Sequence, residues 1–192
     1  MKRLSMILCV GALAACQPPA QENSGRDTTA QAEIPAPVSG GCNMQASRDW
    51  SAVGSQYYVI EAETRGETCR DAVATLRIET TEGATIFTRD YPTAQVPLAF
   101  NPNSDPTGVR NELEAWISNT SETQRASELP AWPLRAERPP GFQPQVTRGQ
   151  YEAARGAQGP LFCYPDGGES NACVALAGAN ATLLGSLTPE RP

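Results

Sequence analysis

The pattern of apolar residues has a period of two over segments 57–64, 74–80 and 85–91, and this feature constrains the fold most strongly. Such alternation is typical of half-buried β-strands, whose successive side chains point to opposite faces. The dipeptide Glu82-Gly83 has turn composition and favours a hairpin between the second and third segments. Because such short connections join neighbouring strands, we expect an antiparallel meander.

After Pro92 the period changes from two to that of a helix. Asp105 can cap the first free amides and Pro106 suits the first helical position, which predicts a helix over 106–118. Its apolar stripe should pack on the sheet and consists of Val109, Leu113, Trp116 and Ile117.

The last third of the chain predicts a short helix over 147–155, strands over 161–164 and 172–176, and a further strand over 181–187. The turn composition between the first two strands predicts a C-terminal hairpin. The predicted fold class is therefore α+β. It consists of an antiparallel β-sheet, made of the meander and the hairpin, with one main amphipathic helix packed on it.

Segment 129–144 contains five prolines in sixteen residues, together with Trp132 and Phe142. A segment of this length without regular structure is either a functional loop or a strap across the domain. The two rings either pack on the domain's own core, which we favour, or form an exposed contact with a partner.

The first fifteen residues have a basic start followed by an apolar run from Leu4 to Leu13, which is too short to span a bilayer and is typical of a secretory signal peptide. The run ends in Leu13-Ala14-Ala15-Cys16. This ending resembles the lipobox of bacterial lipoproteins. The resemblance implies that residues 1–15 are removed and that Cys16 is lipidated, which anchors the chain in a membrane.

Residues 16–41 should form a disordered tether, because they contain almost no large apolar residues and cannot build a core. Residues 42–192 should then form a single α+β domain. Gln17 follows the lipidated cysteine in place of the aspartate that retains enterobacterial lipoproteins in the inner membrane. The resemblance therefore implies the bacterial cell envelope, at the outer membrane and facing the periplasm.

The predicted domain contains four cysteines, an even number that suits an oxidising compartment. Three pairings are possible. The spacing favours Cys42 with Cys69 and Cys163 with Cys173, because the second pair closes a loop of hairpin length. We expect no metal site, since the chain lacks C-x-x-C spacing and histidine.

Without residues 1–15 the chain has 13 arginines, 21 carboxylates and no lysine. The arginines are scattered among acidic residues, which excludes a nucleic-acid interface of the usual kind. A cationic partner suits this charge better, although acidity also serves solubility.

The lack of histidine and lysine removes Ser-His-Asp triads, Cys-His dyads and Schiff-base chemistry. Carboxylate catalysis remains, with Glu61, Glu63, Glu112 and Glu114 as candidates. Their positions instead indicate a solvated strand face and the polar side of the helix. We see no cofactor motif and predict a protein that is not an enzyme.

The sequence leaves three functions, of which the first is an envelope lipoprotein with a structural or binding role, acting through its acidic sheet face or the Trp132 loop. The second is a periplasmic inhibitor of a cationic enzyme. The chain is similar in class to lipoprotein inhibitors of lysozyme, which also have disulfides and β-rich domains. It departs from their plain barrel by its helix and its proline-rich segment. The third and weakest function is a carboxylate-based hydrolase.

Overall fold

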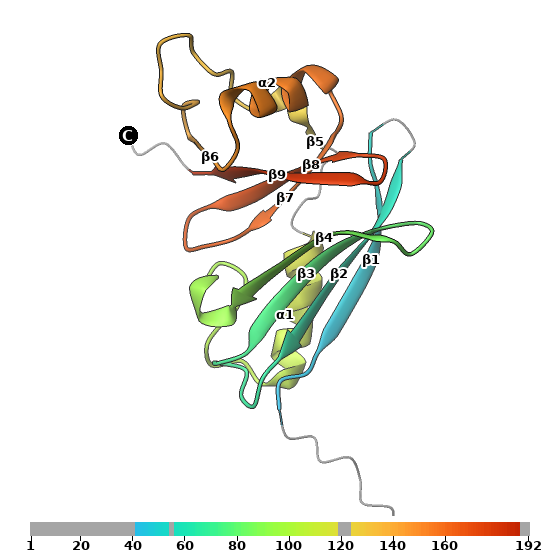
Figure 1. Cartoon of the computed structure of the whole chain (residues 1–192). Helices are drawn as coiled ribbons and strands as arrows, with labels where there is room; N and C mark the ends of the chain where they lie inside the picture. The colour runs from blue at the N-terminus through green and yellow to red at the C-terminus, as the bar shows by residue number, and fades with distance from the viewer. Residues whose placement is uncertain (1–40, 54–55, 119–123, 189–192) are drawn as a thin grey trace, which may run out of the picture. The chain divides into compact units, whose positions relative to one another are not determined.

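A computed structural model describes residues 41–53, 56–118 and 124–188. The predicted signal peptide, Cys16 and all but the last residue of the predicted tether lie outside these ranges. Within them, two antiparallel sheets and two α-helices form the architecture drawn in Figure 1.

Sheet A is an antiparallel meander in the strand order β1-β2-β3-β4. The pairing of β2 with β3, and of β3 with β4, confirms the predicted meander. The four strands are β1 (Gln45–Ser51), β2 (Tyr57–Arg65), β3 (Val73–Thr80) and β4 (Thr85–Pro92).

Strand β1 was not predicted from the sequence. Only Ala46 and Trp50 are buried among its seven residues, and the polar residues between them have weak strand propensity. Its extended conformation comes from pairing with β2 in an uninterrupted register, from Gln45 opposite Glu63 to Ser51 opposite Tyr57.

Sheet B has the order β5-β7-β8-β9-β6, so the predicted C-terminal hairpin, β7–β8, belongs to a sheet separate from the meander. The predicted α+β class, with a meander, a hairpin and one main helix, is confirmed. The five strands are β5 (Gln124–Arg125), β6 (Phe142–Pro144), β7 (Pro160–Pro165), β8 (Asn171–Ala177) and β9 (Asn180–Leu187).

Helix α1 spans Pro106–Ser118, as the sequence predicts. The Asp105 Oδ1 atom accepts a hydrogen bond of 2.7 Å from the Gly108 amide, which satisfies a free donor of the first turn. The predicted stripe is buried, and α1 packs against the first two strands of sheet A, behind the sheet in Figure 1. The Trp116 indole also donates a 2.7 Å hydrogen bond to the carbonyl of Pro165.

Helix α2 spans Arg148–Ala157 and begins with a capping box. The Thr147 side chain accepts from the Gln150 amide, and the Gln150 side chain accepts from the Thr147 amide. Two short 3-10 helices complete the described elements, η1 (Thr93–Gln95) and η2 (Ala126–Glu128).

Two hydrophobic cores lie on opposite faces of sheet B. The larger core joins sheet A, α1 and one face of sheet B, which contributes Phe162 and Tyr164 from β7. The smaller core joins α2, the proline-rich segment and the other face, which contributes Leu161 and Cys163 from β7. Every residue of β7 is buried, because this strand has a core on each side.

Two disulfides, Cys42–Cys69 and Cys163–Cys173, confirm the favoured pairing. The first joins the segment just before β1 to the connection between β2 and β3. The second links directly opposed residues of the β7–β8 hairpin.

Gly185 lets the short strand β6 pair with β9. Its φ of 142° is one that other residues rarely adopt, and a Cβ atom there would overlap the carbonyl oxygen of Gln143. This pairing brings Phe142 of β6 and Leu184 of β9 into the smaller core.

Candidate binding surface

One face of sheet A is not covered by any other described element. The strands alternate regularly, so Ile60, Ala62, Leu76 and Ile78 point into the larger core. The residues between them point the other way. We call this second face the open face; its side chains come from Gln45, Ser47, Asp49, Ser51, Tyr57, Val59, Glu61, Glu63, Arg65, Val73, Thr75, Arg77, Glu79, Thr88 and Asp90.

The open face carries five carboxylates and two arginines, so it is acidic. Arg77 lies opposite Glu61 and two residues from Glu79 along β3, and its pKa is raised chiefly by its hydrogen bond to Glu63 and further by the charges of Glu63, Glu61 and Glu79. Glu63 forms ion pairs with Arg77 and, at 3.1 Å, with Arg65. Within the described ranges, Glu61 and Glu79 form no ion pair within 4 Å, and Glu79 accepts a 2.9 Å hydrogen bond from the Thr85 hydroxyl.

Glu63 does not suit the general acid of the hydrolase alternative. Its pKa is lowered, first by the hydrogen bond from Arg77 and further by Arg65. A general acid needs a raised pKa so that it keeps its proton near neutral pH. The lowered pKa therefore keeps Glu63 ionised near neutral pH, which is unfavourable for that role.

Tyr57 is the first residue of β2, at one end of the open face, and is 56% exposed. Two hollows of about 250 and 380 Å³ adjoin it. Glu82 lines one hollow and Asp49 lines the other. The pKa of Glu82 is lowered, chiefly by a hydrogen bond from Thr80, so this carboxylate is ionised.

The neighbouring Tyr58 also lines both hollows. Its ring is 3% exposed, and its hydroxyl lies 3.2 Å from the carbonyl oxygen of Gly178 and 3.3 Å from Gln56 Oε1. An exposed aromatic ring between two carboxylates is suited to an ammonium or guanidinium group, which can lie over the ring and pair with a carboxylate.

Of the two predicted contact residues, Phe142 is fully buried and Trp132 is partly buried. Phe142 is 2% exposed, and its ring centre lies 5.1 Å from that of Tyr151. The Trp132 ring meets Tyr151 edge to face at 5.6 Å, and its indole donates to the carbonyl of Ala136 at 2.9 Å. Both rings pack against the smaller core, which agrees with the strap rather than the exposed loop.

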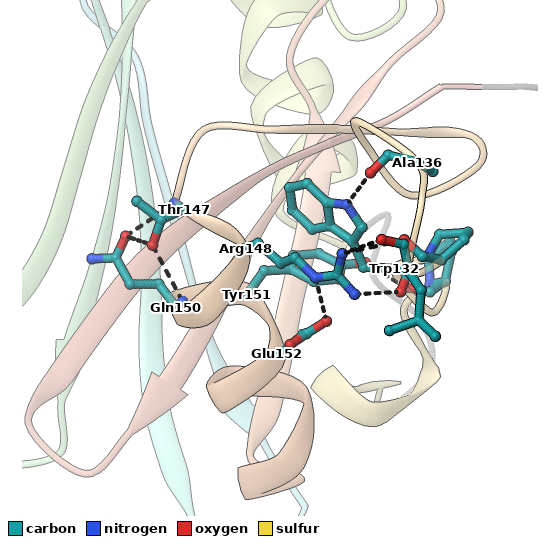
Figure 2. A network of polar contacts seen from close by, with 10 residues as sticks. Trp132, Ala136, Thr147, Arg148, Gln150, Tyr151 and Glu152 are labelled. Atoms are coloured by element: carbon teal, nitrogen blue, oxygen red, sulfur yellow. Dashed lines mark hydrogen bonds and ion pairs between the residues drawn. The ribbon is translucent and has the colours of Figure 1, made fainter.

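Arginines of α2 hold the proline-rich segment in place, as Figure 2 shows for Arg148. Arg148 donates to the carbonyl oxygens of Trp132, Pro133 and Leu134 at 3.2–3.3 Å. Arg155 donates to the carbonyl of Leu129 at 2.9 Å. A segment rich in proline has few amides to pair, and these bonds satisfy its carbonyl groups instead.

Glu112 differs from the expectation that it lies on the polar side of the helix. The side chain is half-buried and accepts a hydrogen bond from Ser104. Its Oε2 atom is buried and has no partner among the described residues. Glu114 follows the expectation, because it is exposed and pairs with Arg110.

Two further features of the described ranges concern metal binding and membrane spanning. These ranges contain no cluster of three or more histidine, cysteine, aspartate or glutamate side chains placed to hold a metal ion. No helix within them is both long and apolar enough to cross a membrane.

Sequence reasoning placed Tyr57 in a strand but missed it as an exposed aromatic residue. The signal was available, because Tyr57 has the same parity as Glu61 and Glu63 and must share their face. The Arg148 contacts had no such signal, since they join a helix to backbone groups fourteen to sixteen residues away.

Comparison with protein-family models, with curated proteins and with solved structures gives no match to this chain.

Proposed function

We propose that this chain is a lipid-anchored protein of the bacterial cell envelope that binds a cationic partner through the open face of sheet A. The observation that carries the proposal is the acidic, uncovered face with Tyr57 exposed at its end. The role is binding rather than catalysis.

The anchor follows from the resemblance of Leu13-Ala14-Ala15-Cys16 to a lipobox. An outer-membrane position facing the periplasm follows from Gln17. Lipid at Cys16 would keep the domain at a surface, where even a weak partner is met repeatedly.

The charge of the open face supports a basic partner. Opposite potentials steer two proteins together and favour one docking orientation. An inhibitor of a cationic enzyme, such as lysozyme, is one form of this proposal, in which a lysine or arginine of the enzyme lies beside Tyr57.

The anchor is tested by replacing the lipobox cysteine. Cys16→Ser should release the protein from membranes and remove the acyl mass from the mature chain. Cys9→Ser, inside the predicted signal peptide, is the matched control and should stay with the membrane fraction. Equal membrane association of the Cys16→Ser variant and the parent would contradict the anchor.

The open face is tested with lysozyme as a basic probe and with affinity capture from the intact envelope. A Glu61→Gln/Glu79→Gln variant should bind lysozyme more weakly than the parent does. The affinity of the parent for lysozyme should fall as salt is added. Glu128→Gln/Glu137→Gln changes the net charge equally at exposed positions outside sheet A. Equal loss in both variants would show that net charge alone is responsible and would overturn the site.

Tyr57→Ala separates the ring from the carboxylates. The variant keeps every charge, so a loss of capture with unchanged salt dependence would assign the contact to the aromatic side chain. Unchanged capture would remove Tyr57 from the proposed site.

A further inference from the structure

The free edge of β1 is the sheet edge least protected against pairing with another strand. Natural sheets protect their edges with short strands, proline, bulges or inward-pointing charges. Within the described ranges, β5 has two residues and β6 has three, one of them proline. Strand β4 ends at Pro92, and its ladder with β3 shifts register between Ile78 and Glu79.

Strand β1 has no proline and no register shift over its seven residues. Its only partner within the described part of the chain is β2. Its one protective feature is Arg48, which shares the inner face with Ile60. The charge of Arg48 limits the registers in which a new strand can pair with β1.

The polar backbone groups of alternate residues in β1 point away from β2. The Met44 carbonyl accepts from the Thr64 amide at 2.8 Å, and the Ala52 amide donates to the Gln56 carbonyl at 2.7 Å. In an antiparallel ladder every second residue bonds to the same neighbour. Gln45, Ser47 and Asp49 therefore direct their N–H and C=O groups toward the free edge.

A groove of about 640 Å³ runs beside this edge. It is lined by residues 43–47 and, from α1, by Arg110 and Glu114. These two side chains pair with each other at 3.5 Å, and both are more than half exposed. Such an exposed pair contributes little to stability, so its members can exchange partners at small cost.

We propose that a second copy of this chain occupies the groove, with its β1 paired antiparallel to the first around a two-fold axis at Ser47. The copy brings its own α1 alongside, running in the opposite direction. Arg110 then faces Glu114 of the partner subunit, and the same contact repeats on the other side of the axis. Arg110 and Glu114 carry opposite charges and lie one helical turn apart. Two antiparallel copies of α1 can therefore each place an arginine beside a glutamate of the other.

The register follows from the side chains of β1. An axis at Ser47 places Arg48 opposite Ala46 of the partner subunit on the inner face. On the open face it places Gln45 opposite Asp49 of the partner subunit. An axis at Arg48 would set two arginines directly opposite each other, which is unfavourable. The dimer would join two copies of sheet A into one eight-stranded sheet.

This inference does not rest on the proposed function, because it is argued from the free edge of β1 and the Arg110–Glu114 pair rather than from Tyr57. A monomeric protein that still binds a basic probe through Tyr57 would overturn the dimer alone. A dimer that fails to bind the probe would overturn the proposed function alone.

The register is tested by cysteine cross-linking of the full-length chain in cells. Ser47→Cys should yield a disulfide-linked homodimer, since residues at the axis are within bonding distance. Thr88→Cys, on the opposite edge strand and equally on the open face, is the control and should stay monomeric. Equal cross-linking at both positions would indicate random collision and would overturn the proposal.

The charge contacts are tested by reversal in detergent-solubilised full-length protein, using sedimentation equilibrium. Arg110→Glu should raise the dimer dissociation constant by about tenfold, which corresponds to about 1.4 kcal/mol. The double variant Arg110→Glu/Glu114→Arg should restore the parent value. A parent that sediments as a monomer throughout would overturn the proposal.

Two other occupants of the edge would be recognised in the same experiments. A monomer whose Ser47 amide is protected from hydrogen exchange would show that another part of the same chain covers β1. Cross-linking of Ser47→Cys to a different protein would show strand addition by a partner. Either result overturns the second copy.

Discussion

The Arg148 guanidinium lies 5.9 Å from the centre of the Trp132 ring and donates a 3.3 Å hydrogen bond to the Trp132 carbonyl oxygen. One side chain of α2 thus holds both the backbone and the ring of the same residue. The proline-rich segment is fixed by this contact and its neighbours, and it does not need regular secondary structure of its own.

Replacing Arg148 should loosen this segment. Arg148→Ala removes charge-assisted hydrogen bonds to three carbonyls and should lower the free energy of unfolding by about 1.5–3 kcal/mol. Limited trypsin digestion should cut faster after Arg135, whereas Arg138 precedes Pro139 and resists trypsin. The control is Arg70→Ala, at an exposed arginine outside the proline-rich segment, and it should cost less than about 0.5 kcal/mol. Equal digestion of the parent and Arg148→Ala would contradict the prediction.

Truncating Phe142 tests the packing of the smaller core. Phe142→Ala should cost about 3–5 kcal/mol, because the ring is buried against Tyr151. The melting temperature should fall by about 2–4 °C for each kcal/mol. Leu134→Ala, at a side chain that is 91% exposed, should leave stability within about 0.5 kcal/mol. A stable Phe142→Ala protein that fails to capture a partner would make this segment the binding site.

Alkaline pH should destabilise the fold through Tyr151. Burial raises the pKa of Tyr151 to about 12, from 10 in the unfolded chain. The protonated form is therefore favoured in the fold, and this contribution is complete below pH 10 and lost as pH rises to 12. Urea unfolding between pH 9 and 12 measures it. Tyr151→Phe should show a smaller decline over this range, and an identical decline would contradict the assignment.

The two disulfides should contribute unequally. In the chain-entropy model, closing the longer loop between Cys42 and Cys69 contributes about 3.5 kcal/mol, and the shorter loop between Cys163 and Cys173 about 2.8 kcal/mol. Paired cysteine-to-alanine variants, unfolded in urea, measure the two values. Non-reducing peptide mapping should recover only these pairs, and a peptide joining Cys69 to Cys163 would be inconsistent with the fold.

Local patterns allowed the sequence to predict α1 and the strands β2–β4 and β7–β9. Helix α1 carries its own cap at Asp105 and its own apolar stripe, so its bounds depend little on the rest of the chain. Strand β1 lacks such a pattern and acquires its structure from β2. Local signals could not predict the division into two sheets, because it depends on β5 and β6 pairing with distant strands.

The candidate surface was predictable only in part. The parity of Glu61 and Glu63 indicated a solvated face, and the structure places both on the open face. The position of Tyr57 beside Gly178 depends on a contact between residues 120 positions apart, made by its neighbour Tyr58. No periodicity in the sequence encodes such a contact.

Because β7 is buried on both faces, a change in the length of this strand would be costly. A shift by one residue would exchange the two sets of side chains, so that Phe162 and Tyr164 would enter the smaller core and Cys163 the larger. The disulfide to Cys173 would then be on the wrong side of sheet B. An insertion or deletion here would damage both cores at once, whereas related chains could still vary by substitution within each face. Insertions and deletions should therefore be tolerated in the turn between β7 and β8 rather than within β7.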